Sequence, residues 1–89
     1  MLIETTVNVW QEGRQFVAHA MPLDVMSSGD TPQVARAALD EAVHLFLETA
    51  RQTGTLDVLL VECGYEQQGE RWASPRFVSV ERHAVALAG

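Results

Sequence analysis

The three histidines and twelve carboxylates are the side chains of this chain best suited to metal chemistry. A metal site needs three or more such ligands to converge on one ion. His19, His44 and His83 lie far apart and lack HxxxH-type spacing, so no metal site is predicted. His44 is expected to face solvent on a helix, in a weak i, i+4 pair with Asp40.

The carboxylates cluster in sequence around one loop and one helix: Asp24, Asp30, Asp40, Glu41 and Glu48. A two-metal nuclease needs carboxylates that project from adjacent strands into a shared site. The strand-like segments are nearly free of acids, with Glu4 as the exception. Ordinary solvated carboxylates are therefore predicted, and a small hydrolase or nuclease using residual acids stays open only as a third hypothesis.

The serines lack the GxSxG context of an activated nucleophile: they are Ser27, Ser28, Ser74 and Ser79. Ser28 instead opens a strand-to-helix turn that continues through Gly29. Asp30 follows there and would repel a phosphate from the start of the helix. We expect no catalytic residue, no cofactor and no enzymatic activity.

The length of 89 residues limits the chain to one domain, residues 1–89. Cys63 is the only cysteine, so an intrachain disulfide is impossible and a reducing, cytoplasmic location is expected. No signal peptide or membrane span is predicted. The net charge is −6, and the six arginines form no basic run. Direct nucleic-acid binding is therefore not expected, whereas a basic protein partner suits the acidic surface.

Hydrophobic periodicity predicts a sheet at the start of the chain. Ile3–Trp10 alternates like a half-buried strand, and Gln11–Arg14 reads as a turn. Phe16–Met21 is the expected return strand, with either of its faces a plausible inner one. Pro22 should end the ladder because it lacks an N–H, and Val25–Ser28 can add a short third strand.

One long amphipathic helix follows, from Pro32 to Thr53, with Thr31 as N-cap and Gly54 as its left-handed stop. Its expected inner face consists of Ala35, Ala38, Leu39, Ala42, Phe46 and Ala50. Its expected polar face consists of Asp40, His44, Glu48 and Arg51. Val43 and Leu47 lie toward that polar side, where we expect them to form an oligomer contact.

The last third of the chain is less regular. Leu56–Cys63 fits a short helix, which is favoured, or a buried strand. Tyr65–Arg71 is polar, and Arg76–Leu87 reads as a last strand of the sheet. The predicted fold is α+β: a two-layer sandwich of an antiparallel three- to four-stranded sheet with one long helix on one face. The element order is β-β-β-α, short helix, β, with a core at 3–54 and a C-terminal part at 55–87.

Trp10 is the aromatic residue with two interpretations. It lies on the nominally polar face of the first strand. The C-terminal segment could cover it, which is the favoured interpretation. Alternatively, a tryptophan on an outer sheet face marks a contact with a partner protein.

The ordered set of motifs over residues 3–54 resembles the HicB-like antitoxin domain. The resemblance rests on the hairpin with Phe16-Val17-Ala18, a Pro/Leu loop, Gly29-Asp30-Thr31-Pro32 and the helix pattern Ala42-Val43-x-x-Phe46-Leu47-Glu48. It implies a truncated ribonuclease-H-like fold without nuclease activity. It also implies binding to a small mRNA-cleaving toxin of the HicA type, and assembly into dimers or tetramers.

Two departures from the family pattern shape the functional expectation. The loop Met21-Pro22-Leu23-Asp24 is shorter than the usual Pro-Asp-Leu-Pro-Gly, and the tail shows no DNA-binding helices, so no operator binding is expected. The expected partner contacts are Trp10, Pro22, Leu23, Asp24 and Val25. The expected function is a non-catalytic antitoxin-like binding module. The alternative is a stand-alone structural or regulatory homo-oligomer of unknown ligand.

Overall fold

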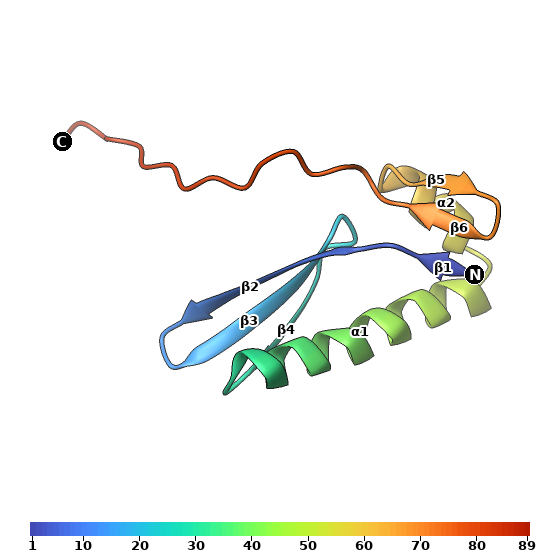
Figure 1. Cartoon of the computed structure of the whole chain (residues 1–89), viewed down its shortest axis with the longest axis horizontal. Coiled ribbons are helices and arrows are strands. Elements are labelled where there is room, and N and C mark those ends of the chain that lie inside the picture. Colours follow the sequence, from blue (N-terminus) through green and yellow to red (C-terminus); the bar gives the residue numbers. More distant parts are fainter.

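The computed structural model describes residues 1–89 as a small α+β fold (Figure 1). Its elements, in chain order, are β1 Leu2–Ile3, β2 Thr6–Glu12, β3 Gln15–Met21, β4 Val25–Gly29, α1 Pro32–Gln52, α2 Leu56–Glu62, β5 Glu66–Gln68 and β6 Arg71–Ala73. One sheet has the order β2-β3-β4 and a smaller one the order β1-β6-β5. The predicted α+β class, with one long helix packed on the strands, is confirmed.

The predicted hairpin is present as β2 and β3, but its turn is shorter than Gln11–Arg14, because Gln11 and Glu12 still pair with β3. Thr6 pairs with Met21 at one end and Glu12 with Gln15 at the other. Between them Gly13 turns the chain with φ +60°, a conformation that glycine adopts without strain. The loop from Pro22 to Asp24 then leads into β4, which pairs antiparallel with β3.

The expected single strand Ile3–Trp10 is two strands. Ile3 pairs in parallel with Trp72 of β6, whereas Thr6 pairs antiparallel with Met21 of β3. Glu4 and Thr5 lie between the two pairings and belong to neither strand. The alternating pattern could not reveal this break because it records which side a residue faces, not which strand it pairs with.

The boundaries of α1 confirm the capping prediction. The Thr31 hydroxyl accepts a hydrogen bond from the Val34 N–H at 3.0 Å, and Pro32 occupies the first turn. Gly54 ends the helix with φ +75°. Gly29 precedes the cap at a close approach, since a Cβ there would lie 2.8 Å from the Ala35 nitrogen.

The buried stripe of α1 rotates around the helix from one end to the other. In the first half, Ala35 and Leu39 are buried against Ala18 and Ala20 of β3. The small side chains let the helix approach the sheet closely. In the second half, Ala50 belongs to a second cluster, while Phe46, predicted to be buried, is exposed. The rotation follows the change of partner from the hairpin sheet to α2 and β6.

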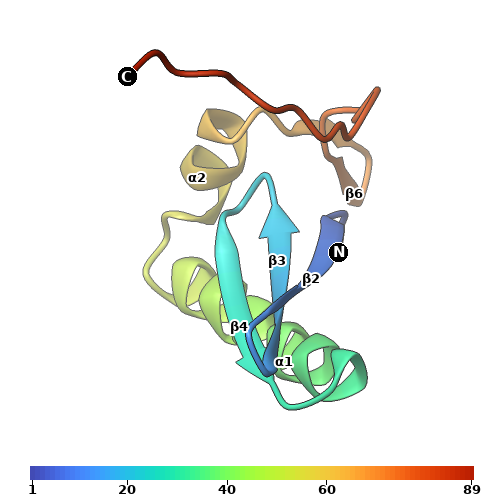
Figure 2. The same ribbon diagram turned by 90° about the vertical axis from the view of Figure 1, so that its left-hand side faces the viewer.

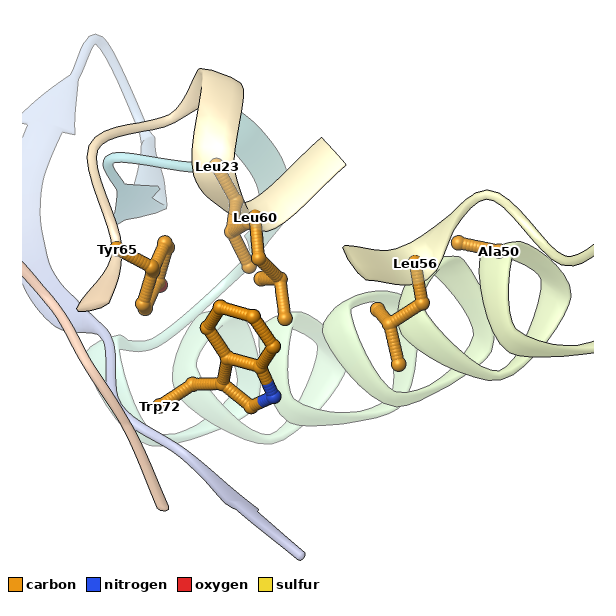
Figure 3. Close-up of a cluster of buried hydrophobic side chains, with 6 residues drawn as sticks. All are labelled: Leu23, Ala50, Leu56, Leu60, Tyr65 and Trp72. Atoms are coloured by element: carbon orange, nitrogen blue, oxygen red, sulfur yellow. The ribbon is translucent and has the colours of Figure 1, made fainter. Parts of the chain in front are cut away.

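That second cluster holds the C-terminal part of the fold together. Its buried members are Leu23, Ala50, Leu56, Leu60, Tyr65 and Trp72. Figure 3 shows the Trp72 indole lying next to Leu60, with Tyr65 on the side of the ring away from Leu56. The favoured short helix at the start of this region is confirmed as α2. The polar segment after Tyr65 forms the β5–β6 ribbon around Gly69, a pairing that its composition did not indicate.

The predicted last strand, Arg76–Leu87, is wrong for this structure. Residues 75–89, which we call the C-terminal tail, contain no helix or strand. Figure 1 shows the tail leaving β6 and running past the hairpin to the far end of the molecule. The physical reason lies at Pro75, which has no N–H to continue the β1–β6 ladder.

No helix of the structure combines the length and the apolar character needed to cross a membrane.

Tyr65 gives the fold an expected alkaline sensitivity. Its hydroxyl donates to the Glu4 carbonyl. Burial, together with the charges of Cys63 and Glu4, raises the Tyr65 pKa from 10 to about 12. The unfolded chain therefore loses this proton first, so the contribution to stability is complete below pH 10 and disappears as pH rises toward about 12. Denaturant unfolding over that pH range should show the decline.

Tyr65→Phe provides the control, because Tyr65 is the only tyrosine. The variant should lose about 1 kcal/mol at neutral pH with the hydrogen bond, and its stability should fall less steeply above pH 10. An equally steep decline in both proteins would assign the effect to another group.

Candidate protein-binding surface

The two faces of the hairpin sheet are unambiguous in the structure. Ala18 and Ala20 of β3 are buried against α1, so Val17 and His19 face the other way. The register places Trp10 and Ser28 on either side of Val17. We call this side the outer sheet face and define it by Trp10, Glu12, Val17, His19, Met26 and Ser28. The sequence left both faces of Phe16–Met21 open; Phe16 lies on the inner one, in contact with the core.

The outer sheet face is apolar at its centre and open to solvent. Trp10 keeps 37% of its surface exposed, and Met26 of β4 is also exposed. These side chains and Val17 line a shallow hollow of about 350 Å³. Figure 2, turned from the view of Figure 1, shows β2, β3 and β4 side by side with one helix, α1, along the sheet. The exposed apolar centre is therefore available to another protein.

A chain of contacts fixes the Trp10 side chain. Its indole N–H donates to Glu12 Oε1 at 3.0 Å. Its ring meets the His19 ring edge to face, with centroids 6.1 Å apart and an interplanar angle of 77°. His19 Nε2 in turn lies 2.6 Å from Asp24 Oδ1. The contacts link the hairpin end to the Pro22–Asp24 loop across one face of the sheet.

The loop itself is anchored at Asp24. This residue has φ +62°, and its backbone N–H donates to the Ala20 carbonyl at 2.8 Å. Its carboxylate is exposed and lies at one border of the outer sheet face, while Glu12 lies at another. An oriented aromatic ring with carboxylates around it is suited to bind an apolar patch flanked by basic side chains.

The predicted partner contacts separate into two groups. Trp10 and Asp24 are exposed and joined through His19, and Pro22 is half-buried between β3 and the rest of the loop. Leu23 is buried in the second cluster and Val25 packs against it. Those two side chains hold the loop onto the core instead of facing a partner.

The favoured interpretation of Trp10, cover by the C-terminal segment, is wrong. Trp10 is exposed, and no residue of the tail hydrogen-bonds to it. The sequence did not select His19, Val17 or Met26. Successive side chains of a strand point to opposite faces of the sheet. This alternation would have placed all three residues on the outer face once one inner residue of β3, such as Ala18, was known.

Val43 and Leu47 do not lie on the polar side of α1. Both pack against the second cluster, and Val43 also contacts the first. The rotation of the buried stripe brings them inward. An oligomer contact through Val43 and Leu47 therefore has to reach the exposed parts of these side chains through the groove beside β2.

That groove, which we call the β2–α1 groove, has a volume of about 360 Å³. Its apolar walls include Ile3, Val7, Leu39, Val43 and Leu47. Its rim is polar and consists of Asp40, His44, Glu48 and Arg51. Thus the polar stripe of α1 borders the groove instead of facing away from the sheet.

Ion pairs order the rim of the groove. Asp40 pairs with Arg36 one turn away, so the predicted pair with His44 is wrong. Arg51 donates to Glu48 and lowers the pKa of that carboxyl. No three histidine, cysteine or acidic side chains converge as a metal site would require.

Comparisons with protein-family models, with curated proteins and with solved structures gave no match.

Proposed function

We propose that this chain is a non-catalytic protein-binding module of the HicB antitoxin type. It neutralises a small, basic, mRNA-cleaving toxin in the cytoplasm by covering the surface with which the toxin holds RNA. The observation that carries the proposal is the outer sheet face, where an exposed tryptophan is held in a defined orientation between carboxylates.

The orientation of Trp10 favours tight binding. A side chain that is already fixed by Glu12 and His19 loses little rotamer freedom when a partner covers it. Tryptophan is also among the residues that most often dominate binding energy at protein interfaces. The shallow hollow between Trp10 and Met26 gives a partner side chain a place to enter.

Charge favours a basic partner. The chain carries a net charge of −6, and Glu12 and Asp24 lie at the borders of the outer sheet face. Opposite potentials speed the encounter with a basic protein and orient it. A toxin bound in this way keeps its fold but loses access to RNA, because the sheet occupies the same basic surface.

Trp10→Ala tests the proposal, with Phe46→Ala as its matched control. Both residues are aromatic and both are 37% exposed, but Phe46 lies on α1 and outside the outer sheet face. The probe is the small basic toxin that the proposal expects to be encoded next to this chain, and the readouts are its affinity by titration calorimetry and the rescue of growth. Trp10→Ala should weaken binding by roughly 30-fold or more and abolish rescue. Phe46→Ala should leave both within about threefold.

Three results would contradict the proposal: the absence of such a neighbouring protein, failure of the two proteins to bind, or equal binding by wild type and Trp10→Ala. RNA cleavage by the purified chain itself would contradict its non-catalytic part.

The alternative, a stand-alone homo-oligomer, is favoured by a different observation. The tail and the outer edge of β2 are both unpaired. These two features lead to an inference that does not depend on the toxin.

A further inference from the structure

The C-terminal tail exposes more apolar surface than an isolated chain would be expected to tolerate. Val78 is 93% exposed and Val80 is 81% exposed, and Val85 and Leu87 are similarly open. None of residues 75–89 makes a backbone hydrogen bond to the rest of the molecule. The tail is extended, apolar and without a partner in the single chain.

The tail has the sequence of a strand. Val78 and Val80 alternate with Ser79 and Glu81, so the two valines share one side of the strand, with Arg76 and Arg82 at its ends. Phe77 lies on the other side, with Ser79 and Glu81. β-branched residues at these positions favour a pleated, half-buried surface. The local sequence therefore agrees with the original strand prediction, while the single chain offers the tail no sheet to join.

The outer edge of β2 has unpaired backbone groups with which a further strand can pair. β2 is the terminal strand of the β2-β3-β4 sheet, so half of its N–H and C=O groups point outward unpaired. Its seven residues contain no proline and no lysine, and the apolar Val7 and Val9 face the helix side. Natural edge strands usually carry prolines or lysines, which prevent pairing with another chain.

The β2–α1 groove opens beneath the same edge. Helix α1 packs mainly under β3 and β4, which leaves Val7 and the flank of Val43 and Leu47 open to the groove. A further strand beside β2 would direct every second side chain toward this opening. Val78 and Val80, at the middle of the segment, supply apolar side chains for it.

In the single chain the tail does not pair with the edge of its own β2. β6 runs parallel to β1, but Glu4 Oε1 accepts the Ser74 N–H at 3.2 Å where the ladder ends. Pro75 follows without an N–H, and its ring lies beside Gly64, where a Cβ would be 3.1 Å away. Figure 1 shows the chain leaving the body after this point. The occupant of the edge is therefore sought in another copy.

We propose that two copies of this chain exchange their C-terminal tails. Residues 76–82 of each copy pair with the outer edge of β2 in the other, and Val78 and Val80 lie over the β2–α1 groove. Seven residues of strand span about 23 Å, which matches the length of β2. Charge agrees: the tail carries two arginines and one glutamate, whereas residues 1–73 carry four arginines and eleven carboxylates.

The exchange leaves the outer sheet face free. Strand addition uses backbone groups along the edge, while Trp10 and His19 project from the face. The dimer therefore presents two outer sheet faces, one from each copy. This inference stands apart from the toxin proposal, and either can fail while the other holds.

The test uses the full chain in sedimentation equilibrium, with Val80→Glu as the variant and Ser79→Glu as its control. The two positions are neighbours in the exposed tail, so neither substitution disturbs the folded body. Wild type and Ser79→Glu should form dimers. Val80→Glu, which places a carboxylate over an apolar groove, should raise the dimer dissociation constant at least about tenfold.

Isotope-filtered nuclear Overhauser spectra of a mixture of labelled and unlabelled chains identify the contact. The exchange predicts signals between Val80 of one copy and Val7 or Val9 of the other. A monomeric wild type would overturn the proposal, as would tail-to-β2 signals within one chain only. A dimer with signals between two β2 strands and equal dissociation constants for Val80→Glu and Ser79→Glu would also overturn it.

Discussion

Leu39→Ala is expected to lower the free energy of unfolding by about 2–5 kcal/mol. Leu39 is 1% exposed and is the largest side chain of the cluster between α1 and the hairpin sheet. Its neighbours Ala18, Ala20 and Ala35 are too small to move into the space that the substitution leaves. The cavity should therefore persist, which places the loss in the upper half of this range. Urea denaturation measures the change.

Leu45→Ala is the matched control for this prediction. It makes the same chemical change in the same helix, but Leu45 is 67% exposed. Its effect should stay within about 0.5 kcal/mol. Equal losses for the two variants would mean that α1 does not pack on the sheet through Leu39, and would refute the packing of the first cluster.

Trp72→Ala is expected to cost about 3–5 kcal/mol, which is comparable to the whole stability of many domains of this size. The Trp72 side chain is buried at 4% exposure among Leu23, Leu60 and Tyr65. Its backbone carbonyl also accepts the Glu4 N–H at 3.1 Å, which ties β6 to the start of the chain. Loss of the indole should therefore loosen β1, β5 and β6 together.

Hydrogen exchange can separate this local effect from global unfolding. In Trp72→Ala, amides of β1 and β6 should lose protection first, while those of the β2–β3 hairpin keep more of theirs. Trp10→Ala is the matched control, because Trp10 is exposed, and it should change stability by no more than about 1 kcal/mol. Unchanged stability of Trp72→Ala would contradict the central place of this side chain in the second cluster.

Local signals in the sequence predicted the first half of the fold well. Gly13 marks a turn, Pro22 ends a ladder, and Thr31 with Pro32 starts a helix, and each acts through its own backbone chemistry. Such features need no knowledge of distant residues. The boundaries of β3 and of α1 therefore agree closely with the prediction, whereas the first hairpin strand is Thr6–Glu12 instead of Ile3–Trp10.

Tertiary pairing decided the features that the sequence did not predict. The inner face of α1 depends on which elements cover each half, so the inward positions of Val43 and Leu47 were not readable from the helix alone. The same holds for β1, whose partner Trp72 lies almost seventy residues away. The strand pattern of the tail was recognised, but the single chain provides no edge for it.

The candidate surface was predictable in part. The position of Trp10 on the polar side of its strand correctly predicted that it lies on the outer face, and Asp24 lies near it. His19 joins them in the structure, but a lone histidine carries no such signal in the sequence without its neighbours. Leu23 was selected from its loop position, although its side chain serves the core.

The most direct test of the central claim is an NMR titration of the labelled chain with the small basic toxin that the proposal expects to be encoded beside it. The chain has two tryptophans, so two indole N–H signals report on the two environments. We predict that the Trp10 indole and the amides of Val17 and Met26 shift, while the buried Trp72 indole does not. The opposite result, with shifts absent from the outer sheet face or confined to the β2–α1 groove, would contradict the proposed binding surface.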